Sequence, residues 1–159
     1  MAVGQLKWTC IMDATTPSWP LSSMLLAAAG ASLVVAGLYF IFVRPPLLPE
    51  DVRYMALPAA QFDAVRPRLE LWLGHVFKVM GGYVLATGVL TITLAATSFR
   101  AHHFGAAVGA LIGGAASIGW MAYVNFAINS DFKWVLLGMA LLWACSLIQF
   151  WIEVHAERA

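Results

Sequence analysis

The sequence predicts an all-α integral membrane protein, with four transmembrane helices in an up-down bundle and a long first loop. Hydrophobic residues make up 62% of the 159 positions and charged residues only 11%, whereas roughly a quarter of a soluble domain is charged. So few charges could not cover a surface that faces water, and the same figures exclude an intrinsically disordered chain. We therefore expect most of the chain to lie in the hydrocarbon of a membrane.

Four apolar runs are the predicted spans, and each has the roughly 20 residues that a helix needs to cross a bilayer. The runs do not alternate apolar and polar residues, as the strands of a membrane barrel do. Helices also satisfy their own backbone hydrogen bonds in lipid. We therefore expect four helices in a single domain that covers residues 1–159. The spans are residues 21–43, 72–98, 104–128 and 134–154.

The connections between the runs differ in length. Residues 99–103 and 129–133 are tight turns, which predict that the second, third and fourth helices are antiparallel neighbours. Residues 44–71 form a long connection, and its prolines prevent the first helix from continuing. Residues 59–71 predict an amphipathic helix in the headgroup region, although a solvated loop with a short helix is the alternative. The apolar stripe of this segment is Phe62, Val65, Leu69 and Trp72.

The distribution of Lys and Arg predicts the orientation. The side of the membrane that holds both termini carries three of these residues, and the side that holds the long first loop carries six. The positive-inside rule therefore places the long loop in the cytoplasm. The stretch RPPLLPEDVRYM, followed by HVFKVMGGYVLATGVLTI, resembles small bacterial membrane proteins. This resemblance implies a bacterial inner membrane but no named family and no functional residues.

Three of the runs carry small residues at the spacing of close helix packing. Lipid gives helices no hydrophobic reason to associate, so close backbone approach must supply the contact. These faces could bind another subunit, or they could pack the four helices against one another. The residues are Gly105, Gly109, Gly113 and Ser117 in the third run, Gly74, Gly81 and Gly88 in the second, and Ala28, Ser32 and Ala36 in the first.

Two ionisable residues, His75 and Lys78, lie early in the second run. Ionisable groups inside a membrane are functional hypotheses by default. Both lie near the interface, where a lysine can extend toward water, so a role as interfacial anchors is the alternative. His75 is a candidate for a proton carrier or a haem ligand. Because His102 and His103 belong to the opposite membrane face, a second axial ligand is missing, and we expect no cofactor.

Two polar clusters lie outside the predicted spans. His102 and His103 are candidates for a metal site, although adjacent histidines in a turn point apart, and a solvated turn is the alternative. The first loop holds a denser cluster, which could contact a partner or a lipid headgroup. Its acidic residues could instead cap a helix near its N-terminus. This cluster consists of Glu50, Asp51, Arg53 and Tyr54.

No motif in the chain predicts catalysis. The nucleophile elbow, the zinc protease motif, the phosphate-binding loop and the dinucleotide fingerprint are all missing. Cys10 and Cys145 are far apart, and the net charge of +1 gives no footprint for nucleic acid. The core stretches contain no carboxylate, which disfavours ion-coupled transport. We expect Asn125 and Gln149 to form hydrogen bonds between the third and fourth helices.

These observations favour a non-enzymatic membrane protein. The leading hypothesis is a structural or accessory subunit of a membrane complex, or a bundle that associates with itself, through the glycine-lined faces. Its partners would be the bilayer and a homo-oligomer or a larger complex. The alternative is a protein that binds or transports a small molecule or lipid in a cavity between the second and third helices, lined by Thr87, Thr91 and Tyr123. A third hypothesis is a membrane enzyme that uses His75 with Lys78 or with the carboxylates of the first loop.

Overall fold

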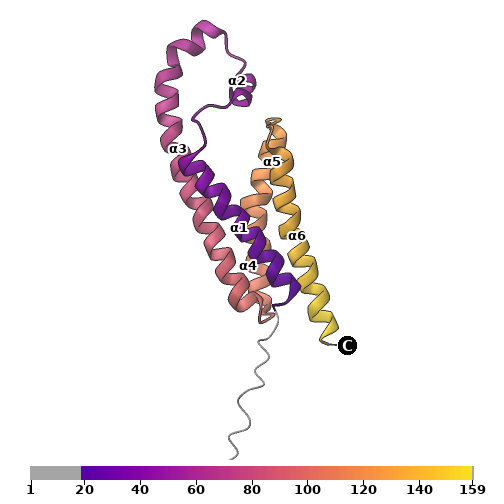
Figure 1. Ribbon diagram of the computed structural model, residues 1–159. Coiled ribbons are helices and arrows are strands. Elements are labelled where there is room, and N and C mark those ends of the chain that lie inside the picture. The colour runs from indigo at the N-terminus through magenta and orange to yellow at the C-terminus, as the bar shows by residue number, and fades with distance from the viewer. Residues whose placement is uncertain (1–18, 159) are drawn as a thin grey trace, which may run out of the picture.

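A computed structural model describes residues 19–158, and these residues form helices and turns with no strand among them (Figure 1). Four helical segments are long and apolar enough to cross a membrane, which confirms the predicted all-helical class and the number of such segments. The helices are α1 (Leu21–Phe42), α2 (Pro49–Met55), α3 (Ala59–Leu94), α4 (Phe104–Gly114), α5 (Trp120–Ala127) and α6 (Lys133–Ala156). Two π-helical turns, η1 (Ala95–Phe99) and η2 (Ala115–Gly119), extend α3 and join α4 to α5.

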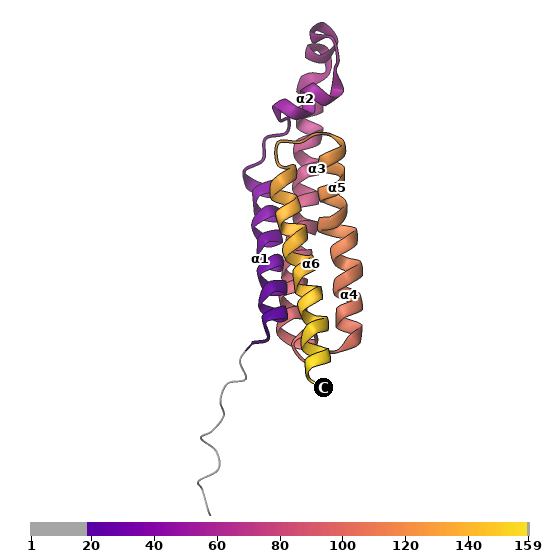
Figure 2. The ribbon, with the colours of Figure 1, turned by 90° about the vertical axis from the view of Figure 1, so that its right-hand side faces the viewer.

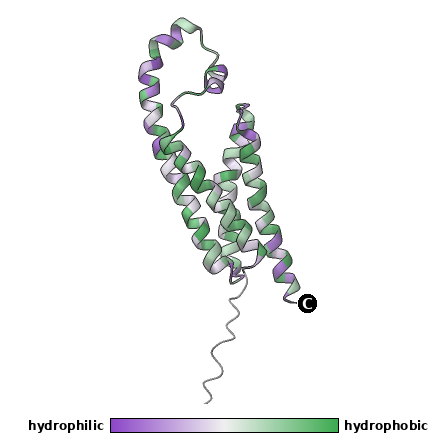
Figure 3. Cartoon of the chain, in the orientation of Figure 1, coloured by the Kyte–Doolittle hydropathy of each residue, from purple (hydrophilic) through white to green (hydrophobic). Residues whose placement is uncertain are grey.

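The second long segment differs most from its predicted bounds. Instead of an amphipathic helix followed by a separate span, one helical segment runs from Ala59 to Phe99, with Pro67 inside it. Pro67 lies only about two turns from the start of the helix, where its missing N–H removes a single intrahelical bond. Figure 1 shows that the first part of α3 extends beyond the other long helices, and Figure 3 shows that this part is more hydrophilic than the rest of α3.

The helices form two arms that are joined at one end. The first arm is α1 packed on α3, and the second arm is α4, η2 and α5 packed on α6. α1 also packs on α6, and this contact joins the arms. From the turn at residues 100–103, α3 and α4–α5 diverge along their length in Figure 1, and Figure 2 shows α1, α6 and α4 side by side. The second and third long helices are therefore close near their turn and separate farther from it.

Glycines bring the backbones of α1 and α3 into direct contact. A Cβ atom added at Gly37 would lie 2.6 Å from the amide nitrogen of Leu85, and one added at Gly88 would lie 2.7 Å from the carbonyl oxygen of Gly30. A Cβ at Gly81 would lie 2.9 Å from the carbonyl oxygen of Gly37. Both helices thus contribute glycines seven residues apart, and a larger residue would separate them. We call this contact the glycine seam.

The small residues that α1 uses in the glycine seam are not the predicted ones. Gly30 and Gly37 are buried, whereas Ala28 is exposed and Ser32 and Ala36 are only partly buried. The sequence pattern was ambiguous because this helix is rich in alanine. Several different sets of small residues four apart could therefore form the packing face. The interval of seven between Gly30 and Gly37 matches the interval between the glycines of α3 that they contact.

The second arm is held by a tryptophan. Trp143 of α6 is buried, and its indole N–H donates a hydrogen bond of 2.9 Å to the carbonyl oxygen of Ala110 in α4. The ring occupies the space above Gly114, where an added Cβ would collide with the indole nitrogen. α4 therefore packs on α6 through Ala110 and Gly114.

Candidate functional site

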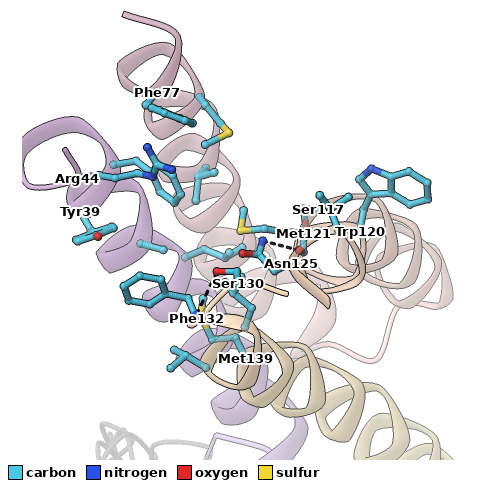
Figure 4. A pocket seen from close by; sticks show the side chains of 18 of the residues that line it. Tyr39, Arg44, Phe77, Ser117, Trp120, Met121, Asn125, Ser130, Phe132 and Met139 are labelled. Carbon is cyan, nitrogen blue, oxygen red and sulfur yellow. Dashed lines mark hydrogen bonds between the residues drawn. The ribbon is translucent and has the colours of Figure 1, made fainter. Parts of the chain in front are cut away.

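A cavity of about 1080 Å³ lies between the two arms, where α3 and α5 have diverged. Its walls come from α1, α3, η2, α5 and α6, and the segment at α2 lines one end. Figure 4 shows side chains from these helices pointing into a shared space. The cavity lies where α3 and α5 have diverged from the turn that follows α3 (Figure 1).

The walls of the cavity are mainly apolar. Tyr83 of α3 and Trp120 of α5 lie on opposite walls and are both exposed, so the cavity opens between these helices. Flexible methionine side chains can adjust to ligands of different shapes, and aromatic rings supply broad contact surfaces. The lining methionines and aromatics are Met80, Met121, Met139, Tyr39, Phe40, Phe77, Tyr83, Trp120 and Phe132.

Arg44, just after α1, marks the polar end of the cavity. Its guanidinium carbon lies 3.5 Å from the centre of the Phe77 ring, and Nη2 lies 3.2 Å from the Oδ2 atom of Asp51. Nη1 also donates a hydrogen bond of 3.0 Å to the carbonyl oxygen of Pro45. The side chain is only 8% exposed, so the ion pair and the ring contact compensate for its removal from water. Figure 4 shows Arg44 and Phe77 side by side.

The short helix α2 connects this end of the first arm to the second arm. Asp51, which pairs with Arg44, also accepts a hydrogen bond of 2.9 Å from the backbone N–H of Leu48 at the start of α2. On the other side, Arg53 lies 3.2 Å from the carboxylate of Asp131 in the turn between α5 and α6. α2 is therefore held to both arms by ion pairs.

Glu50 is the buried member of the same segment. Its side chain lines the cavity, the residue is 5% exposed, and Oε1 accepts a hydrogen bond of 3.4 Å from Ser130 Oγ. The predicted contact cluster thus makes internal contacts through Glu50, Asp51 and Arg53, whereas Tyr54 is exposed. The hydrogen bond from Leu48 to Asp51 supports the capping alternative for that residue.

The ionisable residues of the second predicted span do not line the cavity. His75 and Lys78 are exposed on α3, and His75 Nδ1 lies 2.7 Å from the carbonyl oxygen of Leu71 in its own helix. Their roles as anchors or as functional groups stay predictions.

The two adjacent histidines lie at the other end of the molecule and face different surroundings. His102 Nε2 lies 3.3 Å from Glu153 Oε2, and Nδ1 lies 3.0 Å from Glu157 Oε1, whereas His103 is exposed. Glu153 also accepts a hydrogen bond of 3.1 Å from the backbone N–H of Ser22. Within residues 19–158, no group of three His, Cys, Asp or Glu side chains is arranged to hold a metal ion.

The glycine stripe of α4 faces away from the other described residues of the chain, 19–158. Cβ atoms added at Gly105, Gly109 and Gly113 would meet no atom within 4 Å, so these glycines are not used in internal packing. Ser117, the last member of the predicted stripe, lines the cavity instead. Gly74, the first glycine of the second run, lies beside Pro46. A Cβ atom added at Gly74 would lie 3.7 Å from the proline ring.

The cavity that the sequence predicted between the second and third helices differs in its lining. Thr87 lines the observed cavity, but Thr91 is buried in helix packing and Tyr123 is exposed outside it.

Asn125 also lines the cavity and donates a hydrogen bond of 2.9 Å to the carbonyl oxygen of Met121 in its own helix. Gln149 likewise bonds within its own helix, to Glu153. The predicted hydrogen bonds between the third and fourth helices are therefore wrong.

Sequence reasoning missed the residues that close the polar end of the cavity, above all Arg44 and Phe77. The signal available was an arginine directly before Pro45, at the end of an apolar run.

No protein-family model matches the chain, and neither a curated protein nor a solved structure matches it. Its function must therefore be argued from its own residues.

Proposed function

We propose that the chain is an integral membrane protein that binds an apolar, elongated molecule in the cavity between its two arms. Four helices of spanning length, each with an apolar stretch of at least 18 residues, support residence in a bilayer. The positive-inside rule would place α2 and the polar end of the cavity in the cytoplasm.

The observation that carries this proposal is the cavity itself. Its volume of about 1080 Å³ is at the upper end of the range of about 300–1,000 Å³ that is common for ligand sites. In a bilayer, the gap between Tyr83 and Trp120 would face lipid, so an apolar molecule could enter from the side without crossing water. The charged residues at one end would orient a ligand that has a polar head.

A pair of substitutions in η2 tests the proposal. Ala116 lines the cavity, whereas its neighbour Ala115 is also exposed but does not line it. We expect protein purified in a mild nonionic detergent to retain an apolar molecule that mass spectrometry of an organic extract detects. Ala116→Trp should reduce the amount retained, and Ala115→Trp should leave it unchanged. Protein that retains no such molecule and binds no added fatty alcohol would contradict the proposal.

A second candidate function is association with another copy of the chain through α4. It is favoured by the three glycines of α4 that meet no atom within 4 Å, because helices in lipid associate where small residues allow close approach. The same face would suit the role of a structural or accessory subunit in a larger membrane complex.

Native mass spectrometry in a mild detergent tests this second function. Gly109→Leu should shift a dimer to monomer. The control is Gly138→Leu, because Gly138 of α6 also has open space around it but lies outside the stripe. A wild-type protein that is monomeric at all concentrations, with no co-purifying protein, would contradict association through this face.

A further inference from the structure

The charges that line the cavity do not balance. Among residues 19–158, three formally charged side chains line it, those of Arg44, Glu50 and Asp51. Arg44 and Asp51 pair at 3.2 Å, so their charges offset one another. The nearby pair of Arg53 and Asp131 is exposed and lies outside the lining. Glu50 is therefore left as the uncompensated charge of the cavity wall.

Glu50 is also poorly supplied with hydrogen bonds. An ionised carboxylate has two oxygens and about four acceptor sites. Within residues 19–158, the structure gives this carboxylate one side-chain donor, Ser130 Oγ, at the long distance of 3.4 Å. A buried charge is costly unless it is paired or well bonded. This side chain, 5% exposed and part of the cavity lining, is therefore placed to receive a partner from inside the cavity.

The neighbouring wall suits a cation as well. The guanidinium of Arg44 already lies over the Phe77 ring, which shows that aromatic faces at this end accommodate positive charge. Tyr39 and Phe132 line the same cavity, and their ring faces attract cations in the same way. Farther from Glu50, the lining is apolar and fits a hydrocarbon or aromatic body.

We propose that the ligand of this cavity is a lipophilic cation, whose positively charged head lies beside Glu50 and whose apolar body fills the space between α3 and α5. This inference rests on the proposed function and adds the sign of the ligand's charge. The same chemistry could come from a membrane lipid with an ammonium head or from a free lipophilic amine or quaternary cation.

Two probes of nearly equal shape and opposite charge test the sign. We would measure binding of tetraphenylphosphonium and tetraphenylborate by equilibrium dialysis, with the full chain in a nonionic detergent. The wild type should prefer the cation by about tenfold, since a single charge interaction at a partly dry site has this size. Glu50→Gln should abolish that preference. Asp63→Asn is the control, because it removes an exposed carboxylate of α3 that does not line the cavity, and the preference should survive.

The outcomes separate the two proposals. Equal binding of both probes, tighter binding of the anion, or a preference that persists in Glu50→Gln would overturn the assignment of a cation while leaving the cavity as an apolar site. Failure of the wild type to bind either probe or a neutral fatty alcohol would overturn both proposals. Retained binding of the fatty alcohol in Glu50→Gln shows that this variant is folded with its cavity intact.

Lipid analysis then identifies the source of the cation. Lipids with an ammonium head that co-purify with the wild type, and are depleted in Glu50→Gln but not in Asp63→Asn, would support a lipid ligand. A preference for tetraphenylphosphonium without such enrichment would support a free lipophilic cation. A wild type that enriches anionic lipids, with this enrichment unchanged in Glu50→Gln, would contradict the assignment.

Discussion

The glycine seam and the cavity show two ways in which α3 meets the rest of the chain. Against α1, the glycines of α3 allow backbone atoms to touch, and an added Cβ would lie within 3 Å of the partner helix. Toward α5, the same helix presents Phe77, Met80 and Tyr83, and a cavity of about 1080 Å³ remains. The two sides of one helix thus differ in side-chain volume and in how closely they are packed.

In a bilayer, this difference would follow from the forces that act between helices in lipid. Lipid tails are as apolar as leucine, so helices gain little from burying large side chains and associate where backbones can approach. The glycine seam has that property, and the facing surfaces of α3 and α5 lack it. We infer that the glycines set the close approach of α1 and α3, and that the cavity lies on a side of α3 where no such glycine contact is made.

The largest expected effect comes from filling the glycine seam. Gly81→Leu would place a side chain against the backbone of Gly37, and overpacking against a rigid neighbour should cost about 3 kcal/mol or more. We expect a large fall in the thermal unfolding midpoint measured in detergent, or loss of the folded protein. Gly82→Leu is the matched control, since Gly82 meets nothing within 4 Å. Equal loss in both variants would contradict the close contact of α1 and α3.

The next effect tests the anchor of the second arm. Trp143→Phe keeps most of the ring above Gly114 but removes the hydrogen bond to Ala110. It should lower the free energy of unfolding by about 1–2 kcal/mol, the size of a buried hydrogen bond and its packing. Trp120→Phe, at an exposed position on the cavity wall, should change it far less. Reversal of this order in detergent unfolding would show that Trp143 does not join α4 to α6.

The sequence was sufficient to predict the helices, because their length and apolar character depend on local composition alone. The bounds of α1, α4–α5 and α6 therefore lie within two residues of the predicted spans. The continuity of α3 through Pro67 was not predictable from local rules, since a proline in a helix interior can either kink the helix or break it.

The cavity was harder to predict than the helices because it depends on which helix faces meet. Thr87 was correctly expected in a cavity wall, but Glu50 and Arg44 come from the long first loop, whose path over the helices has no periodic signal. The heptad interval of the α3 glycines was visible, whereas its partner in α1 was hidden among alanines. Contacts between distant segments thus required the structure.

An effect of similar size is expected at the ion pair that holds α2 to the first arm. Asp51→Asn would remove the charge that faces the buried guanidinium of Arg44, and the pair lies partly in water, so we expect a loss of about 1–2 kcal/mol. The same change would weaken the cap of α2. Limited proteolysis of residues 44–58 should become faster. The control is Glu70→Gln, which breaks the exposed pair with Arg66 in α3, and it should leave this rate unchanged.

The smallest effect is expected at the ion pair that holds α2 to the second arm. Arg53 and Asp131 are more than half exposed, and pairs of this kind contribute about 0–1 kcal/mol because water and salt screen them. Arg53→Ala should therefore leave the unfolding midpoint almost unchanged. It should, however, broaden the distribution of distances between two spin labels, one on α2 and one at the start of the second arm. The labels are placed on Tyr54→Cys and Phe132→Cys, with Cys10 and Cys145 replaced by serine. High salt should broaden the same distribution in the otherwise unchanged protein. An unchanged distribution in both experiments would show that buried Glu50, rather than the exposed pair, holds α2 across the end of the cavity.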